Sequence, residues 1–203
     1  VKFLQLQTAP NRSKGEASAE ALTLSLQELL TWDWQGAKLV IEHCDALKSS
    51  HTPSKGCLSL GDEIKGVNAI NKNAKVPMGI VVNWGRSVIE TRRPQGAIEH
   101  ILTLKQHNIL SGLMFSGVSD KDTEYGEWKD SHMPPAPDGT IVKGALGSLL
   151  TQDEMHKCLQ ASSLDASDPD VIVGLKIGIR PKDTSLEDRM DYIKYALAAL
   201  ERA

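Results

Sequence analysis

Residues 38–43 have the sequence KLVIEH, an apolar run that ends in two polar residues. Its centre, Leu39-Val40-Ile41, would place apolar side chains on both faces of an extended strand, because neighbouring residues of a strand point to opposite sides. Such a run is typical of a strand in a parallel sheet that is covered on both faces. The stretch therefore predicts a buried parallel strand with Glu42 and His43 at its carboxyl end.

Outward from this stretch, strand-like and helix-like segments alternate along the whole chain. The pattern predicts strands over residues 1–8, 38–43, 76–83, 111–116 and 171–179, and helices over 16–31, 59–73, 94–109, 151–159 and from 185 onward. Right-handed strand–helix–strand crossovers produce this alternation. The sequence therefore predicts an α/β protein with a parallel sheet.

Two architectures fit this alternation. A chain of 203 residues with five strands could be a complete open doubly wound sheet, whereas a (β/α)8 barrel has eight strands and about 250 residues. Length favours the open sheet. However, no G-x-G-x-x-G follows the first strand and no G-x-x-x-x-G-K-[ST] occurs, so the nucleotide-binding versions of the open sheet lose their signature. Both architectures stay open at this point.

Composition limits the class of protein. The chain has 40% hydrophobic residues and a formal net charge of −3, which fits a globular protein without the basic surface that nucleic acids or anionic membranes attract. No apolar run approaches the roughly 18 residues of a membrane helix. Three cysteines without C-x-x-C spacing predict buried structural thiols. We therefore expect a cytoplasmic protein with a small-molecule partner, and neither a nucleic-acid nor a membrane partner.

A long segment without strand or helix signals interrupts the alternation at residues 117–147. It contains Tyr125, Trp128, His132 and three prolines. Loops of this length in compact domains are usually lids, binding loops or disordered segments. We interpret this one as a lid, with His132 as its candidate catalytic residue.

The strand ends carry the other candidate site residues, because α/β folds place their active groups at the carboxyl ends of parallel strands. Alternation along the strands puts Gln7, Glu42 and Asn83 on one face, where they would converge. Lys176 lies between Gly174 and Gly178 on its own face, which leaves room for its side chain to form a buried pair with Glu42. The candidates at strand ends are Gln5, Gln7, Glu42, Asn83, Trp84, Arg86 and Lys176.

Structural interpretations stand beside these functional ones. Glu42 could be a member of a structural ion pair, and Asn83 with Trp84 could form a turn. We interpret His43, on the opposite face of its strand from Glu42, as a residue that packs against a helix.

Two of these segments carry a resemblance to a known group of proteins. Residues 39–45, LVIEHCD, and residues 79–86, GIVVNWGR, resemble the fifth and sixth strands of the sugar isomerase/epimerase TIM barrels, relatives of xylose isomerase and endonuclease IV. Within that group the chain most resembles an uncharacterised bacterial domain family. The resemblance implies that the five strands are the fourth to eighth of a barrel. Residues 1–203 would then form a single domain, an N-terminally incomplete barrel whose preceding strands belong to a missing segment of a protein of roughly 300 residues.

The resemblance also implies a divalent metal held by Glu, Asp, His and Glu at successive strand ends. Glu42 matches the first of these ligands. Asn83 stands at the Asp position, Arg86 at the His position, and Lys176 near the position of the last Glu. Most of the group's ligand positions are therefore not retained, and Glu42 is the one metal ligand that we carry over.

The resemblance predicts a sugar or sugar-acid isomerase or epimerase that transfers a proton next to a carbonyl, with a degenerate metal site. Glu42 would be the base and Lys176 the electrophile or substrate anchor, while His132 closes from the lid and the remaining strand-end residues hold hydroxyls or a phosphate. A Schiff-base aldolase that uses Lys176, a non-catalytic sugar-binding barrel and a homo-oligomeric assembly stay open as alternatives.

Overall fold

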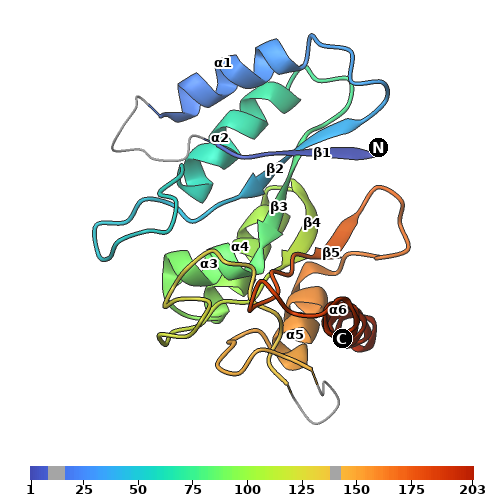
Figure 1. Ribbon diagram of the computed structural model, residues 1–203. Helices are drawn as coiled ribbons and strands as arrows, with labels where there is room; N and C mark the ends of the chain where they lie inside the picture. Colours follow the sequence, from blue (N-terminus) through green and yellow to red (C-terminus); the bar gives the residue numbers. More distant parts are fainter. Residues whose placement is uncertain (9–16, 138–142) are drawn as a thin grey trace.

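The computed structural model describes residues 1–8, 17–137 and 143–203. Five parallel strands lie side by side in their order along the chain (Figure 1). They are β1 (Phe3–Leu6), β2 (Lys38–His43), β3 (Gly79–Asn83), β4 (Leu110–Phe115) and β5 (Ile172–Leu175). A doubly wound sheet would reverse its strand order at a switch point, so the open-sheet alternative is wrong.

Six helices lie between and after the strands: α1 (Ala19–Leu29), α2 (Leu60–Asn71), α3 (Trp84–Thr91), α4 (Gln95–Gln106), α5 (Gln152–Ser162) and α6 (Leu186–Arg202). Five of them begin after a residue whose side chain accepts a hydrogen bond from the first turn: Ser18, Ser59, Asn83, Thr151 and Ser185. Such caps satisfy backbone N–H groups that have no partner inside the helix. None of the helices in the described part of the chain is long and apolar enough to cross a membrane.

The two faces of the sheet differ in character. One face of each strand packs on the helices and forms the hydrophobic core, to which β2 contributes Leu39 and Ile41 and β3 contributes Ile80 and Val82. The helices pack against one another in sequence around this face, α1 on α2 and α3 through α6 in turn. The sheet is therefore a curled half-barrel with its helices outside, and the other face of the strands points inward.

The register sets which residues share the inner face. Gln5 of β1 pairs with Val40 of β2, so Gln7 and Glu42, each two residues further along the chain, are neighbours. Glu42 in turn pairs with Val81 of β3, and Asn83 follows Val81 on the same face. Asn83 pairs with Met114 of β4, and Met114 pairs with Gly174 of β5. Ser116 and Lys176 lie two residues beyond Met114 and Gly174, so they are neighbours on the same inner face. The carboxyl ends of all five strands therefore present polar residues to one opening of the half-barrel. We call this opening the mouth.

The structure corrects the prediction at the end of β3. The sequence allowed a turn at Asn83 and Trp84, but these residues begin the short helix α3. The ring of Trp84 is buried in the hydrophobic core, so the structure does not bring this predicted substrate-binding residue to the mouth. β1, β3 and β5 are also shorter than predicted, and the predicted first residue of the first helix, Glu16, lies outside the described residues. The three cysteines are free and buried, as predicted.

Gly85 allows α3 to start so close to β4. A Cβ at Gly85 would lie 2.3 Å from the Ser116 carbonyl oxygen and 2.7 Å from its Oγ. We therefore expect Gly85→Ala to lower the free energy of unfolding by about 1–3 kcal/mol through overpacking. Urea unfolding followed by circular dichroism measures this change.

Gly61 provides the matched control. It also lies in the first turn of a helix, α2, but its Cβ would meet nothing nearer than 3.9 Å. Gly61→Ala should be neutral or stabilise the protein by up to about 1 kcal/mol, because Ala favours the helix. Equal effects of the two substitutions would contradict the close approach at Gly85.

The predicted lid segment folds back onto the mouth. Isolated bridges join Gly117 to Met133 and Ser119 to Glu127, and Tyr125, Met133 and Ala145 form a small core of their own. Residues 138–142 of the segment lie outside the described residues. That the segment opens and closes stays a prediction, but its turn at residues 130–132 reaches the strand ends.

Candidate functional site

Glu42 lies at the centre of the mouth and is buried. Lys176 Nζ donates to both of its carboxylate oxygens, at 2.5 Å and 2.6 Å, and Asn83 Nδ2 donates to Oε1 at 2.8 Å. Arg86 adds a second cation, with Nη1 3.6 Å from Oε2. The structure therefore brings together the Glu42–Lys176 pair that strand alternation predicts, although the two residues are 134 positions apart.

The amide of Asn83 is oriented by the start of α3. Its Oδ1 accepts from the backbone N–H of Arg86 as the helix cap and from Ser116 Oγ at 2.9 Å. Because both of these groups are donors, the Nδ2 group must face Glu42. The local cap of a helix thus fixes the orientation of a site residue.

Arg86 joins β1, β2 and the long loop. Its Nε donates to Asp130 Oδ2 at 3.2 Å, and its Nη2 forms an ion pair with the same oxygen at 3.1 Å. With the Gln7 amide in its hydrogen-bonded orientation, the Gln7 oxygen accepts from Arg86 Nη1 at 2.7 Å and Nη2 at 3.1 Å. The planar guanidinium carries five N–H donors in a fixed arrangement, which suits it to holding several acceptors at once.

Asp130 is a site residue that the sequence analysis missed. It holds Arg86 from the long loop, and its Oδ1 lies 3.4 Å from His132 Nε2. One signal for it was present, since Asp130 lies two residues before His132, but nothing in the loop predicts contact with a strand end. Gln5 lies on the inner face two residues before Gln7, further from the mouth.

His132 reaches the mouth through the backbone as well. Its carbonyl oxygen accepts from the N–H of Gly178, just after Lys176, at 2.6 Å. A Cβ at Gly178 would lie 2.7 Å from the Ser131 carbonyl oxygen, so this glycine allows the loop to approach the end of β5. The loop is thereby fixed beside Lys176.

The charges of the mouth act on its titratable groups. Burial alone would raise the pKa of Glu42, but the hydrogen bonds from Lys176 and Asn83 and the charge of Arg86 hold that pKa below its usual range. Burial lowers the pKa of His132, as do the charges of Arg86 and Lys176, against the opposing charge of Asp130. At neutral pH Glu42 is therefore ionised and His132 is neutral.

The donor set around Glu42 does not fit the divalent metal that the resemblance implies. Two cationic side chains, Lys176 and Arg86, contact its carboxylate, and a metal bound there would be repelled by both. The amide oxygen of Asn83 already accepts two hydrogen bonds. The assignment of Glu42 as a metal ligand is therefore not supported by the residues present.

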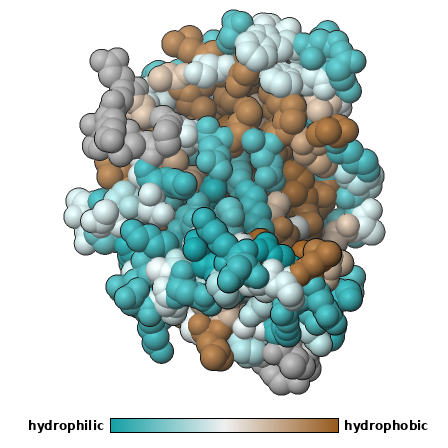
Figure 2. Space-filling view, viewed as in Figure 1, coloured by the Kyte–Doolittle hydropathy of each residue, from teal (hydrophilic) through white to brown (hydrophobic). Residues whose placement is uncertain are grey.

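The molecular surface in the middle of the face shown in Figure 2 is polar. Hydrophilic side chains gather in the middle of the face in Figure 2, over the strands at the centre of Figure 1, with hydrophobic surface above and to one side. Lys176 has 26% of its side chain exposed and His132 has 37%, whereas Glu42 has 2%. A ligand that enters the mouth would therefore meet Lys176 and His132 before Glu42.

Comparisons with known proteins agree with this architecture. A model of the family described as domain of unknown function DUF4862 matches residues 1–192. The uncharacterized protein STM3670 of Salmonella typhimurium is 40% identical over 140 residues, which are 68% of this chain and 42% of that protein. The chain thus spans less than half the length of this curated relative.

A solved structure shares the fold. It is a candidate xylose isomerase from Rhodospirillum rubrum, with a TM-score of 0.58 and 17% sequence identity over 100% of this chain and 62% of its own. The five strands therefore have the fold of part of a xylose isomerase-like TIM barrel, as the resemblance of residues 39–45 and 79–86 predicts.

Proposed function

The chain belongs to the DUF4862 family of domains of unknown function, and from its fold and the geometry of its strand ends we propose that it is a sugar or sugar-acid isomerase or epimerase. The reaction would move a proton next to a carbonyl group. The observation that carries the proposal is the Lys176 ammonium, held by Glu42 beside the neutral imidazole of His132.

Lys176 is suited to stabilise the intermediate of such a reaction. Removal of a proton next to a carbonyl places negative charge on the carbonyl oxygen, and a preorganised cation lowers the energy of that charge. Glu42 keeps the ammonium in place through two short hydrogen bonds. Glu42 is then a positioning residue, because its own carboxylate is buried behind Lys176.

His132 is suited to move the proton. A general base must be unprotonated and within reach of the substrate, and His132 is neutral at neutral pH and partly exposed. It would take the proton from the carbon beside the carbonyl and return it to the neighbouring carbon, or to the other face of the same carbon. Glu42, the base predicted from the sequence, has a lowered pKa and is therefore the weaker base.

Gln7 and Arg86 would bind the hydroxyl or acidic groups of the substrate. The Schiff-base alternative is less favoured, because a protonated Schiff base at Lys176 would keep one N–H group and could therefore keep only one of the two hydrogen bonds to Glu42.

We also propose that the working site is a complete barrel. Among the described strands, β1 and β5 each pair with a single neighbour, so both edges of the half-barrel are available for further strands. Since the similar solved structure is longer than this chain, a segment of the same protein outside residues 1–203 would supply those strands.

Proton exchange tests the proposed function. The protein is incubated with a panel of aldoses, ketoses and sugar acids in D2O, and the hydrogen beside each carbonyl is followed by NMR. We expect exchange with one structural class of sugar. Lys176→Met and His132→Gln should each slow the exchange by about 100-fold or more.

Lys182→Met is the matched control, since Lys182 is exposed and lies after the same strand. It should leave the exchange rate unchanged. Thermal stabilisation by a sugar without exchange would identify a binding protein instead. Trapping of a sugar on Lys176 by borohydride would identify an aldolase, and either result would overturn the proposal.

A further inference from the structure

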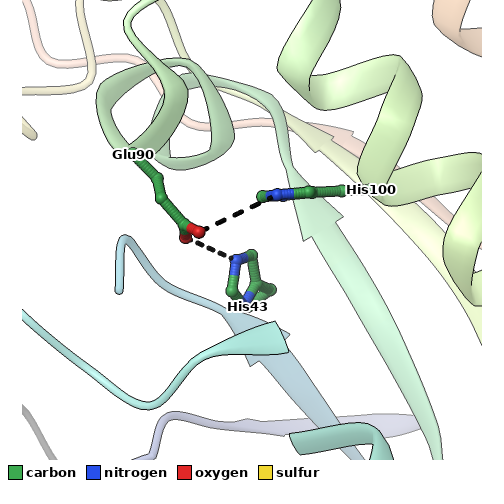
Figure 3. A group of neighbouring side chains, drawn as sticks. All are labelled: His43, Glu90 and His100. Carbon is green, nitrogen blue, oxygen red and sulfur yellow. Dashed lines mark hydrogen bonds and ion pairs between the residues drawn. The ribbon is translucent and has the colours of Figure 1, made fainter. Parts of the chain in front are cut away.

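A second polar cluster lies on the outer face of the sheet, behind Glu42. It consists of His43 at the end of β2, Glu90 in α3 and His100 in α4, whose side chains point toward one another (Figure 3). One ligand atom of each residue lies within 4.8 Å of the other two. His43 and Glu90 are buried, and the His100 side chain is 12% exposed. The mechanism proposed for the mouth uses none of them.

Both histidines are held by their Nδ1 atoms. His43 Nδ1 lies 2.8 Å from Glu63 Oε2, and Thr8 Oγ1 donates to the other oxygen of that carboxylate. His100 Nδ1 lies 3.0 Å from Ser87 Oγ. These contacts fix both ring orientations and turn both Nε2 atoms toward Glu90.

The two Nε2 atoms meet the two oxygens of one carboxylate. His43 Nε2 lies 3.0 Å from Glu90 Oε2, and His100 Nε2 lies 3.9 Å from Glu90 Oε1. Ligands of a tetrahedral zinc ion, at about 2.0–2.1 Å from the metal, are about 3.3 Å from one another. The two histidine nitrogens lie at distances on either side of this value from the two Glu90 oxygens, and the three ligand atoms are within 4.8 Å of one another, so side-chain movements would bring them to three corners of a tetrahedron.

We propose that His43, Glu90 and His100 bind a divalent transition metal such as Zn²⁺. Two imidazoles and one carboxylate are a common ligand set for zinc, with water in the fourth position. The Glu63 contact supplies the carboxylate–histidine pair that usually orients a metal-bound histidine, and Ser87 has the same role for His100. The site differs in position and residues from the strand-end metal of the isomerase group, which involves Glu42.

Lys48 offers a way for the ion to enter. Its Nζ contacts Glu90 Oε1 at 2.8 Å. Because 41% of the Lys48 side chain is exposed, this side chain can turn toward solvent. A surface pocket of about 570 Å³, lined by Lys48, His51 and Glu90 among others, leads to this carboxylate. An incoming ion would replace the Lys48 ammonium and the proton on His43 Nε2, so that the cluster keeps its positive countercharge.

The ion would join one strand of the sheet to two helices of the outer layer. β2, α3 and α4 would each supply one ligand, which ties the end of α3 and the middle of α4 to the sheet. Such a site acts on the stability of the half-barrel and lies outside its mouth.

Cobalt binding tests this site, because tetrahedral Co²⁺ has intense visible absorption. The protein is freed of metal with a chelator and titrated with Co²⁺ and then with Zn²⁺. We expect one equivalent of Co²⁺ with tetrahedral bands, displacement by Zn²⁺ and a higher melting temperature. His100→Gln should weaken binding by more than about 100-fold, and Ser87→Ala, which removes an orienting contact, by about 10- to 100-fold.

Two controls place the ion. His107→Gln changes an exposed histidine that follows the same helix, α4, and should leave the absorption unchanged. Glu42→Gln should also leave it unchanged, which separates this site from the mouth and from the proposed function. Absence of tetrahedral absorption, or its persistence at full strength in both His100→Gln and Ser87→Ala, would overturn the proposal.

Discussion

Glu42→Gln is expected to lower the free energy of unfolding by about 3 kcal/mol, because it removes the anionic partner of a buried ion pair. Gln can still accept a hydrogen bond from Asn83 or Lys176, but Lys176 and Arg86 then face each other across a neutral amide. Arg86 keeps Asp130 as a partner, which places the loss at the lower end of the range for broken buried pairs.

The pH dependence of this loss gives a second readout. Since the folded-state pKa of Glu42 is below its usual value of 4.5, its contribution to stability is present above about pH 4.5 and is lost as the pH falls through the folded value. The difference between the native protein and Glu42→Gln should therefore shrink in acid. Urea unfolding at several pH values measures it.

An exposed glutamate at the end of α6 serves as the control. Glu201→Gln should change the free energy of unfolding by less than about 0.5 kcal/mol, as is usual for surface positions. A loss of the same small size in Glu42→Gln would mean that the cations of the mouth do not depend on this carboxylate.

In the metal-free protein, the combined contribution of His43 and His100 to stability is expected to be largest near pH 6.5 and to fall on both sides of it. Burial alone would lower the pKa of His43, but Glu63 and Glu90 raise it to about 10. This histidine therefore stabilises the fold fully below pH 6.5, and the contribution is lost as the pH rises toward 10. The loss is on the order of 5 kcal/mol over that interval.

His100 has the opposite effect. Burial and the charge of His43 lower its pKa to about 3. Below pH 6.5 the unfolded chain gains a proton on this residue that the folded protein does not, so stability falls with the pH. The two rings are neighbours, with centroids 4.9 Å apart. Because their pKa values shift in opposite directions, their combined contribution to stability is largest at a pH between these two pKa values.

Two variants separate these contributions. His43→Gln should flatten the alkaline side of the stability profile, and His100→Gln the acidic side. Chemical unfolding in the presence of a chelator, at pH values from 5 to 10, would show this. An alkaline slope that persists unchanged in His43→Gln would contradict the assignment of the raised pKa to this histidine.

The parts of the fold that could be predicted depend on local sequence signals, such as apolar runs and helix caps, which involve residues close together in the chain. The strand at residues 38–43 lies where its apolar run predicts, and Ser59, Thr151 and Ser185 begin their helices as caps. The helix α3 was missed because it has only eight residues, and its cap residue, Asn83, is equally common in turns. Burial of Trp84 follows from that helix.

The candidate site was predictable only in part. Alternation along strands places Gln7, Glu42, Asn83 and Lys176 on one face, and the structure brings these residues together. Asp130 lies in a loop, and the partners of His43 lie in helices. The two-residue period of a strand does not apply to these elements, so it could not show which of their residues face the sheet.

Local signals in the sequence thus predicted the parallel strands, the order of strands and helices, and the polar residues at the strand ends. These depend on local propensity and side-chain alternation. The resemblance of residues 39–45 and 79–86 predicted part of a barrel, whereas length favoured an open sheet, and the strand order of the described residues confirms the barrel. Only the tertiary structure showed that Asp130 holds Arg86 and that His43 meets Glu90 and His100, because contacts between residues far apart in the chain depend on how the helices and loops pack around the sheet.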